Sequence, residues 1–447
     1  MRPAHTAAGA AAVTKRADGR EVFHPNEKEG QGMEPRVKWG LITLAMVVLV
    51  LGLGGAAYAF HSGGVAECSG CHSMHSAAAA GSFLLIGSDQ SSTCLTCHER
   101  DTDTGPSSYH VSTAPGSLGA GQSPLQRSPG GDFGWLKKTY NWTLRSTAYT
   151  EEGRSHGHNI VAVDKGYAAD LVNTTAPGGT FPAAQLACNS CHDPHGKYRR
   201  LADGTVARTG APIIGSGSYG TSTEPSAGYA VGVYRLLAGA GYTKGTVTFN
   251  GVPAAKVPST YNRTEASTQT RVAYGKATSG GHQSWGDWCA TCHSGMLTGK
   301  KHPVDQNLGS RVATNYNQYK KTGDMTGTDT TSFTSLAPFI SNTSDYAALA
   351  LLAKNDDSKL NGPASNDQVS CMTCHRAHAS GWMYGLRFNM ESDFMVYAGA
   401  YPGTDNSGAN YARGRLAAET QTAYYDRPAS VFSTYQRAFC NKCHAND

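Results

Sequence analysis

The sequence repeats the pattern Cys-x-x-Cys-His six times, and the six copies contain all twelve cysteines of the chain. The two cysteines of such a motif can each bond to a haem vinyl group while the following histidine binds the iron from one side. One short segment therefore fixes both an edge of the porphyrin and one axial ligand. The motifs are Cys68/Cys71/His72, Cys94/Cys97/His98, Cys188/Cys191/His192, Cys289/Cys292/His293, Cys371/Cys374/His375 and Cys440/Cys443/His444.

The Cys-x-x-Cys pattern also occurs in zinc sites and in disulfide or dithiol sites, and both alternatives fit this chain poorly. A structural zinc ion needs four ligands, and six scattered Cys-Cys-His triplets do not group into tetrahedral sets. A disulfide framework gives no reason for a histidine after every second cysteine. The motifs therefore predict a c-type cytochrome with six covalently bound haem c groups.

The first part of the chain has the pattern of a secretory leader. A basic segment that begins at Met33 precedes an apolar run over residues 41–53, and small residues follow up to Ala59. This pattern predicts a signal peptide over residues 33–59 and a mature chain that begins at Phe60. Residues 1–32 are predicted to be a gene-model extension or a disordered leader. Residues 60–447 are predicted to form a single hexahaem domain.

The composition is poorly suited to a protein with a large apolar core of its own. Of 447 residues 53 are glycine, and only 39% are hydrophobic. We therefore expect a multihaem cytochrome c fold that is mostly coil, with short α-helices and 3-10 turns and very little β-structure. Covalently bound, stacked haems are expected to form the core. The net charge of +5 does not indicate nucleic-acid binding, because six haems would add twelve propionates.

Six irons need six further ligands beyond the motif histidines. Outside the leader, the other histidines are His61, His75, His110, His156, His158, His195, His282, His302 and His378. All six distal positions can therefore be histidine. Bis-histidine ligation keeps iron six-coordinate, whereas a methionine ligand would raise the reduction potential.

Three of these histidines follow a haem-binding histidine by three residues, namely His75, His195 and His378. Such a histidine cannot reach the far face of its own haem, so each is expected to bind the iron of a neighbouring haem. The shortage of other candidates favours distal roles for His110, His158 and His302 as well, whereas His61 stays an open candidate. His156 and His282 are expected to face solvent or to contact a propionate.

The segments between the motifs resemble the OmcS-like family of extracellular hexahaem cytochromes, which form microbial nanowires. The resemblance covers essentially all of the mature chain, and it includes the segment Cys-His-Asp-Pro-His-Gly-Lys-Tyr-Arg-Arg at residues 191–200. The chain departs from the family in the lengths before Cys94 and Cys289, and His156 and His282 are particular to it. Further matching segments are residues 60–68, 129–135, 258–266, 374–381 and 440–444.

The resemblance implies a homopolymer in which haems stack along a continuous line and every iron has two histidine ligands. It also implies that His75 binds the haem held by Cys371, Cys374 and His375 in a neighbouring subunit. The other distal positions that it implies are His110, His158, His195, His302 and His378, with His61 also present in the matching segment.

The expected function is that of a secreted, extracellular filament subunit. It would conduct electrons to extracellular acceptors such as metal oxides or partner cells, and other outer-surface cytochromes would be its partners. The alternative is a monomeric electron carrier of the periplasm or outer surface. An enzyme is not expected, because nine spare histidines can close all six iron faces and no motif ends in lysine.

Overall fold

The computed structural model describes residues 68–75, 83–101, 108–258, 270–277, 280–298 and 304–444. The chain divides into two compact units, residues 1–57 and 58–447, and every described residue belongs to the second unit. The predicted leader and the histidines His61 and His302 lie outside the described residues. Within the described part of the chain, no helix has the length and apolar character needed to span a membrane.

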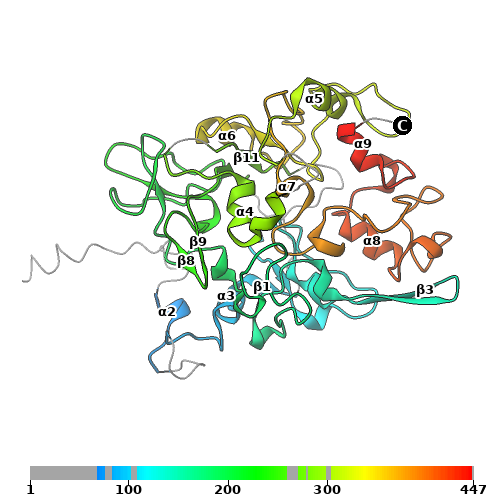
Figure 1. Cartoon of the computed structure of the whole chain (residues 1–447), viewed down its shortest axis with the longest axis horizontal. Coiled ribbons are helices and arrows are strands. Elements are labelled where there is room, and N and C mark those ends of the chain that lie inside the picture. The colour runs from blue at the N-terminus through cyan, green and yellow to red at the C-terminus, as the bar shows by residue number, and fades with distance from the viewer. Residues whose placement is uncertain are drawn as a thin grey trace, which may run out of the picture. The chain divides into compact units, whose positions relative to one another are not determined.

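The helices of the described residues are short, and coil connects them (Figure 1). The α-helices are α2 (Cys68–Cys71), α3 (Gln90–His98), α4 (Trp285–His293), α5 (Gly309–Gln318), α6 (Tyr346–Leu352), α7 (Cys371–Cys374), α8 (Ala417–Ala423) and α9 (Ala438–His444). The 3-10 helices are η1 (Pro115–Ser117), η2 (Phe133–Lys137), η3 (Gly153–His156), η4 (Val163–Lys165), η5 (Ala183–Gln185), η6 (Cys188–Ser190), η7 (Tyr234–Leu236), η8 (Ser294–Leu297), η9 (Met383–Gly385), η10 (Ala409–Tyr411) and η11 (Ala429–Val431).

The strands form small separate sheets of two or three strands. They are β1 (Glu99–Arg100), β2 (Ser112–Thr113), β3 (Tyr140–Leu144), β4 (Thr147–Glu151), β5 (Arg199–Arg200), β6 (Val206–Ala207), β7 (Val231–Gly232), β8 (Thr243–Lys244), β9 (Val247–Thr248), β10 (Ala255–Lys256), β11 (Ala273–Gly275) and β12 (Ile340–Ser341). The expected mostly coil chain with short helices and little sheet is confirmed.

The β3–β4 hairpin is the longest paired element among the described residues, with Tyr140 opposite Glu151 and Leu144 opposite Thr147. Its two-residue turn, Arg145-Ser146, has positive φ at both positions, as a type I′ turn requires. Most of the hairpin is exposed, but Tyr140 and Glu151 at its base are buried. The base of the hairpin therefore places the Glu151 carboxylate in the interior, while its strands run out to the turn (Figure 1).

The apolar interior is divided into several aromatic-rich clusters. The largest contains Trp135, Trp382 and Tyr424 and packs against Cys374, and the next contains Trp285 and packs against cysteines of the third and fourth motifs. Two smaller clusters border Cys188 and Cys443. The protein core is thus distributed around the haem-attachment cysteines, which agrees with a fold organised by its haems.

Candidate haem-ligation sites

The second, fourth and sixth motifs, which we call the even motifs, form the ends of the helices α3, α4 and α9. Helix α3 begins after Asp89, whose carboxylate accepts a hydrogen bond from Ser92 N at 2.8 Å. Ser284 caps α4 in the same way, at 3.0 Å from Asp287 N. Such caps satisfy amide groups that have no partner inside the helix. They fix where each helix begins and so where its Cys-x-x-Cys-His ends.

The first, third and fifth motifs, which we call the odd motifs, lie on the single turns α2, η6 and α7. In each, the histidine leaves the turn and pairs with a short downstream segment through an antiparallel bridge. The three bridges are His72 with Leu85, His192 with Leu237 and His375 with Leu386. The flanking backbone bonds are also equivalent: Ser73 N to Leu84 O, Asp193 N to Leu236 O, Arg376 N to Gly385 O, Ile86 N to Cys71 O, Ala238 N to Cys191 O and Arg387 N to Cys374 O.

The same downstream segment holds the histidine ring of each odd motif. His72 Nδ1 lies 2.6 Å from Phe83 O, and His192 Nδ1 lies 2.7 Å from Arg235 O. His375 Nδ1 lies 2.9 Å from Tyr384 O. All three carbonyl residues have a positive φ, of 64°, 49° and 61°. A carbonyl can only accept a hydrogen bond, so Nδ1 carries the proton and Nε2 carries the free lone pair that an iron needs.

The even motifs use carbonyl groups from other kinds of loop. His98 Nδ1 lies 3.0 Å from Tyr109 O, and His293 Nδ1 lies 2.9 Å from Pro177 O. Together with the odd motifs, five motif histidines are therefore fixed in the tautomer that presents Nε2. The sequence analysis did not identify these carbonyl residues. For the odd motifs, the only shared sequence signal is a leucine two positions after the carbonyl residue.

Three pairs of histidine rings are spaced to hold an iron between them. The ring centres of His72 and His195 are 6.5 Å apart, and their planes differ by 8°. An iron bonded at about 2 Å to one nitrogen of each ring would separate the ring centres by about 6 Å. The other two pairs are His192 with His378 at 6.4 Å and 56°, and His158 with His293 at 6.0 Å and 52°.

The non-motif histidines of these pairs are also held in place. His158 Nδ1 lies 2.7 Å from Ala377 O, and His378 Nδ1 lies 3.3 Å from Gly131 O. Burial lowers the pKa of His158 to about 4 and that of His378 to about 3. Both rings are therefore neutral at ordinary pH, which is the form that binds a metal.

The other described histidines outside the motifs lie in different environments. His110 is buried, and its Nδ1 lies 2.9 Å from Ser108 Oγ. His75 is exposed. The expectation that His156 faces solvent or a propionate is wrong, because it is fully buried between Trp135 O and Glu151. His282 places Nε2 3.2 Å from Gly204 O.

The cysteines of successive motifs meet in a regular order. The thiol of Cys94 hydrogen-bonds to that of Cys188, an interaction that raises the pKa of Cys94. Cys289 and Cys371 form the equivalent contact between the fourth and fifth motifs. Helix α4 packs on α7 at this point (Figure 1). The second and fourth motifs thus each contact the next odd motif through their first cysteines.

The second cysteines of each odd motif and of the even motif that follows it lie near enough to interact electrostatically. Neighbouring thiols contribute to the raised pKa of Cys71, Cys191 and Cys443, in each case after the larger effect of burial. The pairs are Cys71 with Cys97, Cys191 with Cys292, and Cys443 with Cys374. Odd and even motifs therefore alternate along the chain, a repeat of two motifs that the sequence analysis did not find.

The residues present fit six covalently attached haems. All twelve cysteines are free thiols in this structure, so none is committed to a disulfide bond. Three histidine pairs have the spacing of two axial ligands, and five motif histidines have Nε2 available. When bound, haem supplies a one-electron redox centre at each motif.

Comparisons with known proteins agree with this geometry. A family profile described as the doubled CXXCH motif matches residues 61–103. The C-type cytochrome OmcS of Geobacter sulfurreducens is 51% identical over an alignment of 420 positions that covers 88% of this chain and 95% of that protein. A cryo-electron microscopy structure of the OmcS nanowires from the same organism matches with a TM-score of 0.80 and 51% identity, over 87% of this chain and 100% of the other.

A second solved structure, the outer membrane cytochrome S filament from Geobacter sulfurreducens, matches with a TM-score of 0.79 and 50% identity. It covers the same 87% of this chain and 100% of the other chain. The matches confirm a multihaem c-type cytochrome with covalently bound haem c. The chain belongs to the OmcS family of c-type cytochromes.

Proposed function

We propose that each of the six irons has two histidine ligands, one from its own motif and one from elsewhere. Ring pairs with the spacing of two axial ligands support three assignments, to His158, His195 and His378. Burial and a fixed Nδ1 support His110. His302 is assigned from the sequence, and His61 stays the remaining candidate.

The assignment of His75 follows a rule that the chain uses twice. His195 of the third motif faces His72 of the first, and His378 of the fifth motif faces His192 of the third. Each such histidine is therefore the distal ligand for the haem of the preceding odd motif. His75 belongs to the first odd motif, so the motif that it serves must lie in another subunit. The fifth motif, which ends at His375, is the last odd motif of the chain. No later odd motif of the same chain can therefore supply a distal histidine to its haem.

The cysteine contacts support the same junction. Even motifs contact the following odd motif through their first cysteines, which leaves the first and the sixth motif without such a contact inside the chain. Their first cysteines, Cys68 and Cys440, are both exposed, whereas Cys94, Cys188, Cys289 and Cys371 are all partly buried. Two different, complementary ends on one chain favour head-to-tail assembly into an open filament.

The chain is an extracellular electron-transfer protein that polymerises into a filament of identical subunits. Bis-histidine ligation suits this role, because a six-coordinate iron changes its oxidation state with little rearrangement. We infer that metal oxides or partner cells accept the electrons and that other outer-surface cytochromes supply them. The observation that carries the proposal is that His75 is exposed, whereas none of the histidine ring pairs among the described residues includes His375.

No substrate-converting activity is proposed. Such an activity needs an open iron face, and the proposed ligands close all six. The alternative of a monomeric electron carrier requires His75 to bind an iron of its own subunit. The alternative is not favoured, because the two solved relatives are a nanowire and a filament.

The leader is part of the proposal as well. Export of the chain follows from a signal peptide over residues 33–59, with Phe60 as the first residue of a single domain over residues 60–447. Residues 1–32 are proposed to be a gene-model extension or a disordered leader. N-terminal sequencing and the intact mass of the secreted protein test both points, and a mature peptide from residues 1–32 would refute them.

Electron microscopy of the secreted, haem-replete protein tests the proposed assembly. Wild-type protein is expected to form filaments, and His75→Ala is expected to stay monomeric with one haem in six in the high-spin state. His282→Ala is the matched control, because His282 is not a proposed ligand. Wild-type protein that stays monomeric, or His75→Ala protein that polymerises normally, would contradict the proposal.

A further inference from the structure

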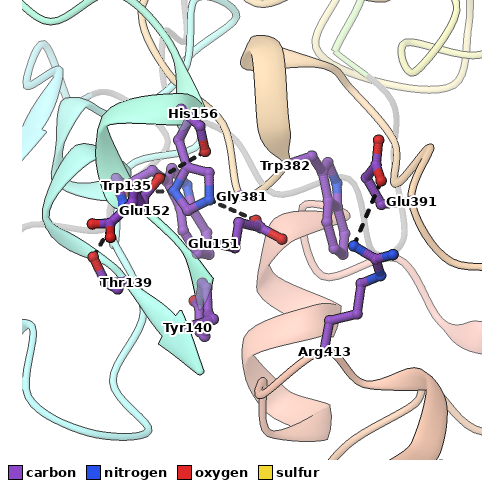
Figure 2. A network of polar contacts seen from close by, with 12 residues as sticks. Trp135, Thr139, Tyr140, Glu151, Glu152, His156, Gly381, Trp382, Glu391 and Arg413 are labelled. Carbon is purple, nitrogen blue, oxygen red and sulfur yellow. Dashed lines mark hydrogen bonds and ion pairs between the residues drawn. The ribbon is translucent and has the colours of Figure 1, made fainter. Parts of the chain in front are cut away.

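His156 is held by hydrogen bonds at both of its ring nitrogens. Its side chain is fully buried, with Nδ1 2.8 Å from Trp135 O and Nε2 2.7 Å from Glu151 Oε1 (Figure 2). A carbonyl oxygen and a carboxylate can only accept, so both ring nitrogens donate. The ring therefore has one orientation and no rotational freedom, although it is not a proposed iron ligand.

Glu151 is itself fixed from a distant part of the chain. It forms a buried ion pair with Arg415, and the exposed fractions of the two side chains are only 3% and 1%. Arg415 Nη2 also donates to Gly381 O at 2.8 Å. Burial opposes the charge of Glu151, but Arg415 and the bond from His156 outweigh it and hold the pKa at about 2. The carboxylate that orients His156 is thus a rigid anion at neutral pH.

The backbone of His156 continues directly into a bridge that carries two proposed distal ligands. His156 O accepts from Ser380 N at 3.0 Å, and His158 N donates to His378 O at 2.9 Å. Gly157 pairs with Ala379 between these two bonds. The segments 156–158 and 378–380 therefore form one piece of structure, and each carries one distal histidine.

This bridge has little room to adjust. A Cβ atom on Gly157 would lie 2.3 Å from His378 O and 2.6 Å from Ala379 Cα. A Cβ atom on Gly131, in the next segment, would lie 1.8 Å from Ala379 O. Because the backbones touch, a movement of His156 displaces His158 and His378 together.

We propose that His156 is a positioning residue for two haem sites at once. Through the bridge it sets the position of His158, the distal partner of His293, and of His378, the distal partner of His192. The buried Glu151–Arg415 pair anchors His156 to the segments around residues 381 and 415. This inference rests on the ligand assignments of the proposed function, and it gives a role to a buried histidine that is not itself a proposed ligand.

Spectroscopy of the secreted holoprotein tests this role with three variants. His156→Ala removes both ring hydrogen bonds and is expected to lose low-spin signal from up to two of the six haems and to shift their reduction potentials. His156→Gln keeps one of the two bonds and is expected to lie between the alanine variant and wild type. His282→Ala removes a histidine outside the bridge and is expected to match wild type.

The outcomes separate this inference from the proposed ligation. If His158→Ala and His378→Ala each leave the low-spin signal intact, the ligand assignment fails, and the inference fails with it. If those two variants lose signal while His156→Ala keeps wild-type spectra and potentials, the ligation stands and the positioning role is overturned, even if the protein melts at a lower temperature. Should His156→Ala fail to accumulate, a glutamine variant identical to wild type overturns the inference by itself.

Discussion

The rings of His72 and His195 face each other at 6.5 Å and within 8° of parallel, although 122 positions separate the two residues in the chain. His72 belongs to the first motif, and His195 follows the third motif by three residues. A covalently attached haem between them would join two motifs that no helix or sheet connects. The histidine three residues after a motif therefore connects distant segments of the chain in addition to its proposed role as a ligand.

Replacing His195 by alanine tests this link inside one subunit. We expect six covalent haems, one of them high-spin, because the haem of the first motif would lose its second ligand. Polymerisation is expected to persist, since the subunit junction uses His75 instead. Electron paramagnetic resonance and haem counting by mass check the result, and an unchanged low-spin signal would count against the pairing.

Gly157→Ala is expected to destabilise the holoprotein by about 1–3 kcal/mol, as overpacking typically does. The new Cβ atom would lie 2.3 Å from His378 O, which is backbone and has no flexible end to move. Gly215→Ala is the matched control, because a Cβ atom there meets no atom within 4 Å. Thermal melting of both variants measures the difference, and equal melting temperatures would refute the close approach.

The backbone conformation of Tyr384 gives a prediction for the odd motifs. Its φ is 61°, a conformation that β-branched residues tolerate poorly and glycine accepts readily. Tyr384→Val is expected to cost about 1–2 kcal/mol and to weaken the hold on His375, whereas Tyr384→Gly is expected to keep it. Because the Tyr384 side chain is 62% exposed, neither change removes core packing. The low-spin fraction and melting temperature distinguish the two variants.

Acid is expected to weaken the buried network around Glu151. The pKa of Glu151 is lowered from 4.5 to about 2 in the folded state, so its contribution is full above the unfolded pKa. As the pH falls from about 4.5 to about 2, that contribution of about 3 kcal/mol is lost. Glu151→Gln should show a shallower decline of stability over this range, measured by thermal melting against pH. A decline as steep as in wild type would argue against the network.

Removal of haem is expected to unfold the described domain. Its buried apolar residues form separate clusters, and four of these clusters pack against motif cysteines. Without haem, these four clusters would lose part of their packing surface. Circular dichroism of the apoprotein should show mostly coil, and its amide hydrogens should exchange quickly. A cooperative melting transition in the apoprotein would show that the chain has a sufficient core of its own.

Much of this site was predictable from sequence, because its chemistry is carried by short motifs. The attachment cysteines and motif histidines follow from spacing alone, and the coil-rich fold follows from a composition low in apolar residues. Modest helical patterns occur at residues 346–354 and 413–425, and the structure has α6 (Tyr346–Leu352) and α8 (Ala417–Ala423) there. Each helix is shorter than its pattern, since sequence patterns place helix ends poorly.

The features that the sequence did not reveal depend on backbone geometry. Phe83, Arg235 and Tyr384 share no side-chain chemistry, and apart from a leucine two positions later only their positive φ identifies them. The Glu151 carboxylate that holds His156 pairs with Arg415, which lies 259 positions beyond His156 in the chain. Such partners are set by tertiary structure, which the local pattern around His156 does not encode.

The alternation of odd and even motifs bears on which chain lengths could polymerise. If the proposed junction joins the sixth motif to the first in the way that Cys94 and Cys188 join the second to the third, the covalent backbone does not define the period of the wire. Chains of four or eight motifs would then begin with an odd motif and end with an even one, and they could extend the same line. A chain of five motifs would begin and end with an odd motif, so its two ends would not be complementary.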